Sequence, residues 1–322
     1  MPSVTSADVA RAAGVSRTTV SYVLNDTPGV SVSQATRQHV RDTAARLGYA
    51  PSAAARTLRR GRSDLVVCVL PDWPTGPVVD LLLDHLTDVL AERGLFVLVH
   101  HHRDSRALTD LWRAVTPRAV VGLAPFTPDE ARAMAQAGIV VVGTVQTTDD
   151  DAFDRSQHDL AALQVDHLAA RGHRRVAVAA TDDPRLARFA QARLAGVRDA
   201  CAARSLPAPV SAPVPVDRPA TDVVRDWHET GVTAVAAYND EVALAVLAGA
   251  REAGLDVPAD LAVIGVDDSP AARVSAPPLT TVAQPILAQS DHLAAGVLAA
   301  IDGTAAPSWP ADPAVVVVRG SA

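Results

Sequence analysis

Short apolar runs alternate with stretches that favour helices from residue 64 onward. The runs are rich in Val, Ala and Ile and lie near 65–70, 95–99, 119–124, 139–143, 175–180, 233–238 and 261–266, with a last strand at Val315–Val318. The helical stretches lie near 77–92, 105–115, 128–137, 157–171, 188–204, 220–230 and 240–253. Strands that alternate with helices form parallel sheets with helices on both faces. This part of the chain therefore predicts two doubly wound subdomains, with a cleft at the carboxyl ends of their strands.

The first fifty residues predict three short helices instead. They are expected at 6–13, 17–24 and 34–47, with Thr5, Ser16 and Ser33 as the residues that cap them. Gly14 can adopt the left-handed conformation that ends the first helix. Two helices joined by a glycine-containing turn, with a third as a brace, form the helix-turn-helix plan.

Charge divides the chain at the same place. Residues 1–62 carry nine arginines against three aspartates, a net charge of +6, whereas the remaining residues carry −13 and the whole chain −7. A basic head on an acidic body indicates that the head alone binds nucleic acid. The alternative is a solvated surface on which arginines cluster by chance.

The second helix is the expected recognition helix, which would enter the major groove. Arg17, Thr18 and Tyr22 point away from its apolar face and are the candidates for reading base edges. Short polar side chains suited to phosphates are Thr5, Ser16, Thr19, Ser21 and Asn25. The alternative is an ordinary three-helix bundle whose polar face is only hydrated.

The segments VTSADVARAAGVSRTTVSYVLND and RLGYAPSAAARTLRRGRS resemble the head of the LacI/GalR (lac-repressor) family of bacterial transcription regulators. The matching positions are Ala10, Gly14, Val15, Ser16, Thr19, Val20, Ser21, Asn25, Gly48, Tyr49 and Pro51. The resemblance implies a DNA-binding domain over 1–50, in which Arg17, Thr18 and Tyr22 read the bases.

The resemblance also implies a hinge helix over 51–62 that forms on DNA, pairs with its twin and enters the minor groove. Leu58 matches the leucine that wedges into a base step, and Ala55 matches the small residue close to the groove. Arg59 lies where it would meet the groove and its phosphates. A flexible basic linker is the alternative, and it also describes the DNA-free state.

The body continues the resemblance in DHLAARGHRRVAV, TAVAAYNDEVALAVL and VPADLAVIGVDDSPAARVSAPPLTTVAQP. The family's regulatory domain is related in fold to periplasmic sugar-binding proteins, which implies an effector-binding and dimerisation domain over 63–322. Its N-subdomain is expected at 63–154 and 285–310, and its C-subdomain at 155–282 and 313–322. Effector-binding candidates are Arg193, Asn239, Asp267, Trp73 and Phe126. Alternatively, Arg193 and Asp267 form a structural pair that bridges the subdomains.

Two departures from the family pattern affect the expected cleft. Ser156, Gln157 and Leu160 stand where the family has an Asp-Asn pair followed by glycine. The loop PDWPTGP carries Trp73 in place of smaller polar residues. Both changes argue against an ordinary sugar ligand.

No catalytic or cofactor motif accompanies this pattern. The sequence has no G-x-G-x-x-G after the first strand, no P-loop and no G-x-S-x-G elbow. On a strand at most two of the three adjacent imidazoles His100–His102 could share a metal. Two cysteines, Cys68 and Cys201, build neither a disulfide framework nor a zinc site, and Cys68 is expected to be a buried small hydrophobe. We therefore expect no enzyme, no cofactor and no metal.

The expected function is that of a sequence-specific DNA-binding transcriptional regulator, in the first place a repressor. It would act in the cytoplasm as a homodimer on a near-palindromic operator, with a small molecule in the cleft setting its operator affinity. No signal peptide or membrane span is expected, and no leucine heptads for a tetramer. The alternatives are a solute-binding sensor module and an α/β enzyme with an appended DNA-binding head.

Overall fold

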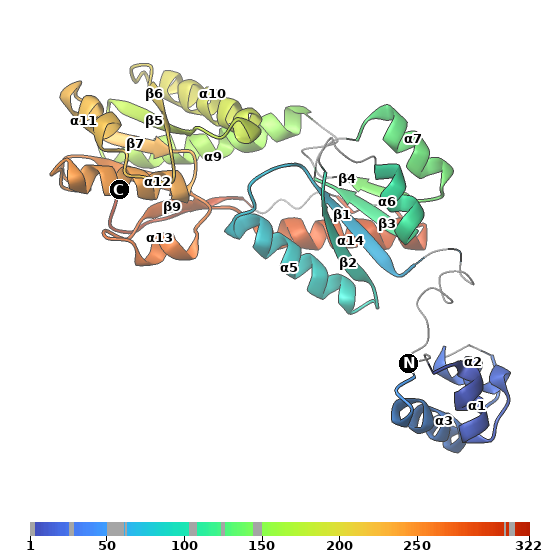
Figure 1. Cartoon of the computed structure of the whole chain (residues 1–322). Coiled ribbons are helices and arrows are strands. Elements are labelled where there is room, and N and C mark those ends of the chain that lie inside the picture. The colour runs from blue at the N-terminus through green and yellow to red at the C-terminus, as the bar shows by residue number, and fades with distance from the viewer. Residues whose placement is uncertain are drawn as a thin grey trace. The chain divides into compact units, whose positions relative to one another are not determined.

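The computed structural model describes residues 4–25, 29–49, 61, 63–102, 108–123, 126–143, 150–305, 307–308 and 313–322. The chain forms two compact units, residues 1–64 and 65–322 (Figure 1). No helix among the described residues is long and apolar enough to cross a membrane. The hinge candidates Ala55, Leu58 and Arg59 lie outside the described residues.

The first unit has the three predicted helices, α1 (Ser6–Ala13), α2 (Arg17–Leu24) and α3 (Gln34–Arg46). The side chains of Ser16 and Ser33 cap α2 and α3, and Gly14 ends α1 in the left-handed region at φ 64°. At the start of α1, the Asp8 carboxylate accepts hydrogen bonds from the Thr5 N–H and hydroxyl. These bonds lower the pKa of Asp8. The predicted helix boundaries are confirmed to within one residue, as are the caps Ser16 and Ser33 and the capping box of Thr5 with Asp8.

A small valine core holds the three helices together. Val9 from α1, Val20 and Val23 from α2, and Val40 from α3 are buried together. Helices of eight residues are not stable alone in water, so this shared core is what keeps them folded.

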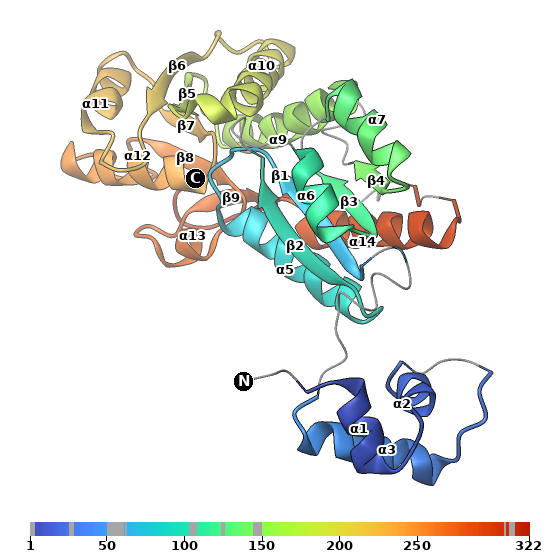
Figure 2. The same cartoon turned by 45° about the vertical axis from the view of Figure 1, so that its right-hand side comes forward.

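The second unit contains two sheets, and we call the parts built on them the N-lobe and the C-lobe (Figures 1 and 2). The N-lobe sheet has the parallel order β2-β1-β3-β4, with β1 (Leu65–Leu70), β2 (Phe96–His101), β3 (Ala119–Gly122) and β4 (Val140–Gly143). One face is covered by α5 (Pro77–Ala91) and α14 (Ile286–Asp302), the other by α6 (Leu108–Val115) and α7 (Pro128–Gln136). Cys68 faces α5 and α14 as the expected buried hydrophobe, and burial raises its pKa to about 12.

The C-lobe sheet has the order β10-β9-β8-β7-β5-β6. Its strands are β5 (Val176–Thr181), β6 (Val210–Val214), β7 (Ala234–Ala237), β8 (Ala262–Val266), β9 (Thr280–Ala283) and β10 (Val315–Val317). One face is covered by α9 (Asp150–Ala170) and α10 (Ala187–Ala203), the other by α11 (Thr221–Glu229), α12 (Asp240–Glu252) and α13 (Pro270–Val274). All pairings are parallel except that of β10 with β9.

The two predicted doubly wound sheets are confirmed, while several elements differ from the sequence expectation. The strands β6 and β9 and the helices α13 and α14 were not expected. Pro213 obscures β6, and it is tolerated there because β6 is an edge strand. The helix α9 begins at 150 rather than 157, because Phe153 is buried one turn before Gln157. The expected subdomain boundary at 154/155 falls inside α9.

The strand ends of both lobes lead to the polar residues of interest. Trp73 follows β1, Asn239 follows β7 and Asp267 follows β8 directly. The carboxyl ends of parallel strands are where open α/β sheets bind ligands. This arrangement places the candidate effector site at the strand ends of the second unit.

Candidate functional site

The helix α2 presents an apolar and a polar face. Val20 and Val23 are buried in the head, whereas Arg17 and Thr18 are exposed and Tyr22 is half-buried. The three residues named for base reading thus lie on the accessible side of α2. A guanidinium can bond two acceptors of one guanine, which makes Arg17 the side chain best suited to discriminate a base.

The residues named for phosphate contacts already make local bonds. The Ser16 hydroxyl accepts from the Thr19 N–H at 3.0 Å and lies 2.8 Å from the Thr19 hydroxyl. The Asn25 amide donates to the Ser21 carbonyl at 2.6 Å. Thr5, at the start of α1, donates its hydroxyl to Asp8 at 2.7 Å. These bonds fix the helix ends, where backbone N–H groups and short polar side chains can meet a phosphate backbone.

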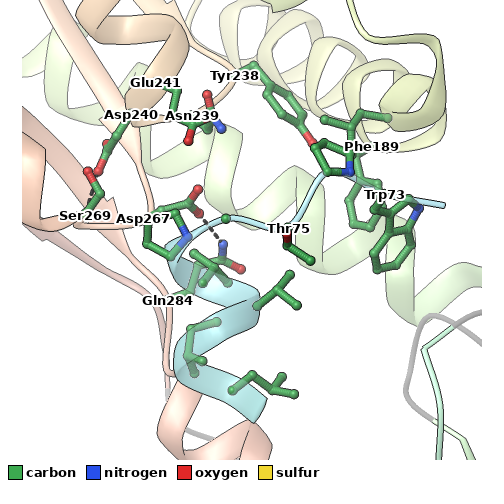
Figure 3. A pocket seen from close by; sticks show the side chains of 18 of the residues that line it. Trp73, Thr75, Phe189, Tyr238, Asn239, Asp240, Glu241, Asp267, Ser269 and Gln284 are labelled. Atoms are coloured by element: carbon green, nitrogen blue, oxygen red, sulfur yellow. Dashed lines mark hydrogen bonds between the residues drawn. The ribbon is translucent and has the colours of Figure 1, made fainter. Parts of the chain in front are cut away.

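A cavity of about 200 Å³ lies in the second unit and is lined by both lobes (Figure 3). The N-lobe contributes the loop after β1 and the start of α5, from Trp73 to Leu82. The C-lobe contributes Arg193 from α10, the residues after β7 and Asp267 after β8. Of the five effector candidates, the cavity brings together Arg193, Asn239, Asp267 and Trp73.

Phe126 does not line this cavity. It is half-buried and packs with the apolar residues between the N-lobe sheet and the helices α6 and α7. An aromatic residue after a strand can serve the core as well as a ligand, and the sequence does not distinguish the two roles.

Arg193 is buried, with 8% of its surface exposed. Its Nε donates to the Gln157 side-chain carbonyl at 2.9 Å, and its Nη1 donates to the backbone carbonyl of Tyr238. The guanidinium carbon also lies 4.5 Å from the centre of the Tyr238 ring. Neutral oxygens and an aromatic face therefore hold this cation, so its charge is not cancelled by a bonded carboxylate.

Asp267 is held by an amide instead. Its carboxylate accepts a hydrogen bond from the Gln284 Nε2 at 2.8 Å, and no ion pair joins it to Arg193 among the described residues. Burial raises the pKa of Asp267 to about 6, against the opposing influence of the Arg193 charge. The alternative of a structural Arg193–Asp267 pair thus has no bond to support it in this structure.

The turn that carries Asp267 is conformationally strained. Asp267 has φ 117° and Asp268 has φ 51°, in the region that side chains other than glycine rarely adopt. Such residues cost about 1–3 kcal/mol each and persist where the surroundings hold them. The turn directs the Asp267 carboxylate toward the cavity while Asp268 bonds elsewhere (Figure 3).

Asn239 and Asp240 have unequal roles. The Asn239 side-chain oxygen caps α12 by accepting from the Val242 N–H at 3.0 Å. Asp240 is 1% exposed and accepts from the Thr281 hydroxyl at 2.5 Å and the Ser269 N–H at 2.7 Å. Desolvation raises the pKa of Asp240. Its carboxylate thus links the start of α12 to the strand β9 and to the residue before α13.

A cluster of three aromatic side chains contains residues from both lobes. The Trp73 and Phe189 rings meet edge to face at 5.1 Å, and Phe153 packs on Phe189 in the same manner at 5.0 Å. Arg188 stacks over Phe153 at 4.1 Å. In Figure 3, Trp73, Phe189 and Tyr238 line one side of the cavity, and the carboxylates and amides line the other.

The departures from the family pattern occur beside this cavity. Gln157 is buried and bonds Arg193, as described above, while Leu160 is buried in the C-lobe core. Ser156 is exposed and donates to the Phe153 carbonyl at 2.6 Å. A neutral glutamine amide thus serves as the partner of Arg193.

Sequence reasoning missed Gln157 as a contact residue, and it missed Tyr238, Gln284 and Glu241 entirely. Each lines the cavity. Tyr238 and Glu241 flank residues that were identified, so their place at a strand end was an available signal. Gln284 follows β9, a strand that was itself not predicted.

The cavity can bind a small molecule through directional polar bonds on one side and ring contacts on the other. A carboxylate, a guanidinium and several amides suit a ligand with several hydroxyl or amine groups. Among the residues that the structure describes, no group of three or more His, Cys, Asp or Glu could hold a metal ion.

Comparison with known families gives two matches. Residues 5–52 match the bacterial regulatory proteins of the lacI family, and residues 165–322 match the periplasmic binding protein-like domain. The second match covers most of the C-lobe, including the cavity residues Arg193, Asn239 and Asp267.

Curated relatives match over most of the chain. The transcriptional regulator DegA of Bacillus subtilis is 30% identical over 304 residues, which are 87% of this chain and 86% of DegA. The regulator reg1 of Streptomyces lividans is 30% identical over 94% of this chain and 91% of its own. GalR of Escherichia coli is 29% identical over 93% and 90%.

Solved structures agree over the full length. The lac repressor dimer bound to operator and the anti-inducer ONPF matches with a TM-score of 0.82 and 25% identity, covering 99% of each chain. The complex of the regulator CelR with cellobiose matches with a TM-score of 0.67 and 26% identity, covering 99% of this chain and all of CelR.

Proposed function

The chain belongs to the lacI family of bacterial regulatory proteins, and from this premise we propose that it is a repressor that a small molecule controls. It binds operator DNA through its first unit and the effector in the cavity of its second. The observation that carries this proposal is that one chain combines an exposed recognition face on α2 with a cavity lined by both lobes.

In the first unit, Arg17, Thr18 and Tyr22 read base edges. Their accessible position on α2, beside a buried valine face, supports this role. The backbone contacts come from the local polar residues at the helix ends, which are Thr5, Ser16, Thr19, Ser21 and Asn25. A net charge of +6 on residues 1–62 favours binding to the phosphate backbone.

Residues 51–62 act as a hinge between a DNA-binding domain at 1–50 and an effector domain at 63–322. Ala55, Leu58 and Arg59 are the residues that enter the minor groove, with Leu58 as the wedge. The sequence match to the family supports this assignment. The subdomain ranges 63–154 with 285–310, and 155–282 with 313–322, are proposed for the N-lobe and the C-lobe, with the boundary near 154 moved to the start of α9.

The effector is held by Arg193, Asn239, Asp267 and Trp73. A ligand bound by residues of both lobes changes the relative stability of two lobe arrangements, and thereby the operator affinity. The family resemblance also made Phe126 a candidate, and its place outside the cavity lining makes an indirect contribution the better proposal for it.

A homodimer suits a near-palindromic operator, because each head reads one half-site. The N-lobe offers a surface for it, since Leu81, Phe96, Val99 and Leu287 are exposed on α5, β2 and α14. Phe96, 65% exposed, is the most accessible of these. We expect Phe96→Asp to produce monomers in analytical ultracentrifugation, and an unchanged dimer would contradict this surface.

The protein acts on DNA in the cytoplasm and binds its effector without converting it. The curated relatives, which are transcriptional regulators, support the second statement. Incubation of the protein with a bound ligand, followed by mass spectrometry of the ligand, would detect turnover and so favour the enzyme alternative.

The central test joins operator and effector. Operator fragments are first selected from genomic DNA, and the genes beside them supply candidate ligands. Operator affinity is then measured by fluorescence anisotropy, with and without each ligand, for the wild type and for Asp267→Ala. We expect Asp267→Ala to keep its operator affinity and lose the ligand response, because the ligand shifts the equilibrium only through contacts that differ between the two arrangements.

The matched control is Asp222→Ala, the same substitution at a side chain that is 95% exposed and does not line the cavity. It should respond to the ligand as the wild type does. A normal ligand response in stably folded Asp267→Ala would remove Asp267 from the effector site.

A further inference from the structure

The side chain of Asp268 is held by two arginines. Its Oδ1 accepts from the Nη2 of Arg319, and its Oδ2 accepts from the Nη2 of Arg273 at 2.9 Å. Asp268 directly follows Asp267, and both residues have a positive φ. A contact that holds the Asp268 side chain therefore also restricts the backbone of Asp267 and the direction of its carboxylate.

The two arginines hold Asp268 unequally. The Arg319 side chain is 15% exposed, and its Nη1 also donates to the Leu279 carbonyl at 2.8 Å. The Arg319 backbone N–H donates to the Thr280 hydroxyl at 2.9 Å. The Arg273 side chain is 62% exposed, and Asp268 is its one side-chain partner among the described residues. Water screens an exposed pair more strongly than a buried one, so Arg319 is the principal anchor.

The backbone N–H groups of Asp267 and Asp268 both bond to the strand β9. The Asp267 N–H donates to the Val282 carbonyl at 2.8 Å, and the Asp268 N–H points to the Thr281 hydroxyl at 3.4 Å. Together with the Arg319 bonds, these contacts hold a backbone conformation that side chains other than glycine rarely adopt. Without the bonds to the Asp268 side chain, the turn would keep these two backbone contacts, the bond between Asp267 and Gln284, and the bond from the Ser269 N–H to Asp240.

We propose that Arg319 is a positioning residue of the effector site, which through Asp268 holds the strained turn that directs the Asp267 carboxylate into the cavity. Arg319 does not itself line the cavity. The proposal rests on the proposed function only in taking Asp267 as an effector contact. It extends the site to a residue 52 positions later in the chain, near the antiparallel edge strand β10.

The test compares the full-length wild type with Arg319→Ala and Arg273→Ala, without effector or DNA. Crystal structures report the φ angles of Asp267 and Asp268 and the bond between Asp267 and Gln284. In parallel, NMR of protein labelled with ¹³C-aspartate follows the titration of the Asp267 carboxyl, assigned as the signal missing in Asp267→Asn. Its midpoint in the wild type is expected at about 6.

In Arg319→Ala we expect Asp267 to leave its positive φ, the Gln284 bond to break and the midpoint to fall by about one unit, because the carboxyl becomes more exposed to water. Arg273→Ala should keep all three properties. A merely structural role for Arg319 would lower the melting temperature and leave the turn and the midpoint as they are, and that result would overturn the proposal. So would equal effects from the two arginine substitutions.

Asp268→Asn serves where Arg319→Ala fails to fold. Asparagine adopts positive φ as readily as aspartate but cannot form the ion pair, so a partial shift of the midpoint is expected. An unchanged turn and midpoint in Asp268→Asn would count against the anchor. These measurements use neither ligand nor operator. A negative result here would therefore reject the role of Arg319 without affecting the proposed function. A negative result in the ligand-response test would likewise leave the role of Arg319 in the turn unaffected.

Discussion

The recognition face of α2 and the cavity of the second unit solve the same problem, the placement of several polar side chains, in different ways. On α2, Arg17, Thr18 and Tyr22 lie within six consecutive residues, so helix geometry alone sets their spacing. In the cavity, Trp73, Arg193 and Asp267 come from three distant segments, and two sheets bring them together.

The difference teaches that local and long-range sites fail for different reasons. The α2 face depends on a cap, a turn glycine and a small valine core. The cavity depends on close packing between elements far apart in sequence, such as Gly265, where an added Cβ would lie 2.3 Å from the Asp240 Oδ1. Substitutions that impair one site and leave the other functional therefore show what each site depends on.

The largest effect is expected from separating the regions entirely. Removal of residues 1–62 should abolish operator binding, because the DNA-reading residues and the basic charge lie there. The remaining body, which has its own cores, should stay folded and dimeric. Anisotropy with a selected operator and sedimentation velocity measure the two outcomes. Operator binding by the shortened protein would contradict the assignment of DNA binding to the first unit.

The packing at the cavity can be broken by one methyl group. Gly265→Ala should destabilise the second unit by about 3 kcal/mol, because Asp240 is buried and hydrogen-bonded and cannot move aside. The control is Gly76→Ala at the cavity wall, where the nearest atom is 4.0 Å from the added Cβ. Thermal unfolding compares the two, and equal stability would show that the contact relaxes.

The α2 face can be tested at a single side chain. Arg17→Ala should weaken binding to the best operator by about 1–3 kcal/mol and relax the preference at one symmetric base pair. The measurement is affinity for a set of operators that differ at each position. Equal weakening on all sequences would mean that Arg17 contacts only phosphate.

Asp267 makes the stability of the second unit depend on pH. Its pKa is raised from 3.8 to about 6. The contribution of the protonated carboxyl to the free energy of unfolding is therefore full below pH 3.8 and is lost as the pH rises through about 6. Asp267→Asn, which cannot ionise, should escape this loss and gain about 1.5 kcal/mol over the wild type above that range, half of the full value because the side chain is partly exposed.

Unfolding measured from pH 4 to pH 8 follows the difference between Asp267→Asn and the wild type. A difference that stays constant over this range would contradict the raised pKa.

The smallest effect concerns a helix cap. Ser16→Ala should cost the first unit about 1 kcal/mol, since the hydroxyl accepts the Thr19 N–H at the start of α2. Ser16→Asn should restore most of this stability, because asparagine caps as well as serine. Circular dichroism of the helical signal on heating checks both, and no recovery in Ser16→Asn would assign the loss to another contact.

The same contrast explains what the sequence could predict. The ends of α1 and α2 follow from caps and a glycine close by in the chain, and the structure has them where expected. The early start of α9 was missed because residues 150–156 include four charged side chains and one large apolar residue, Phe153, which is buried.

In the cavity, Asn239 and Asp267, which follow predicted strands, were found, whereas Gln284, which follows an unpredicted strand, was not. Asp267 follows the apolar run of β8, which the pattern shows clearly. Gln284 follows β9, a strand of four residues with two threonines. The partner of Arg193, Gln157, lies 36 residues away on another helix, and nothing in local sequence joins the two.

The edge-to-face contact of Trp73 with Phe189 gives the protein a built-in optical reporter. Trp73 is one of four tryptophans, and it lies half-buried where the N-lobe meets α10 of the C-lobe. Indole emission responds to the polarity of its surroundings, whereas Trp112 and Trp227 are buried within their own lobes. Any separation of the lobes hydrates Trp73 and shifts its emission to the red, so the opening of the cavity can be followed in solution without an added dye.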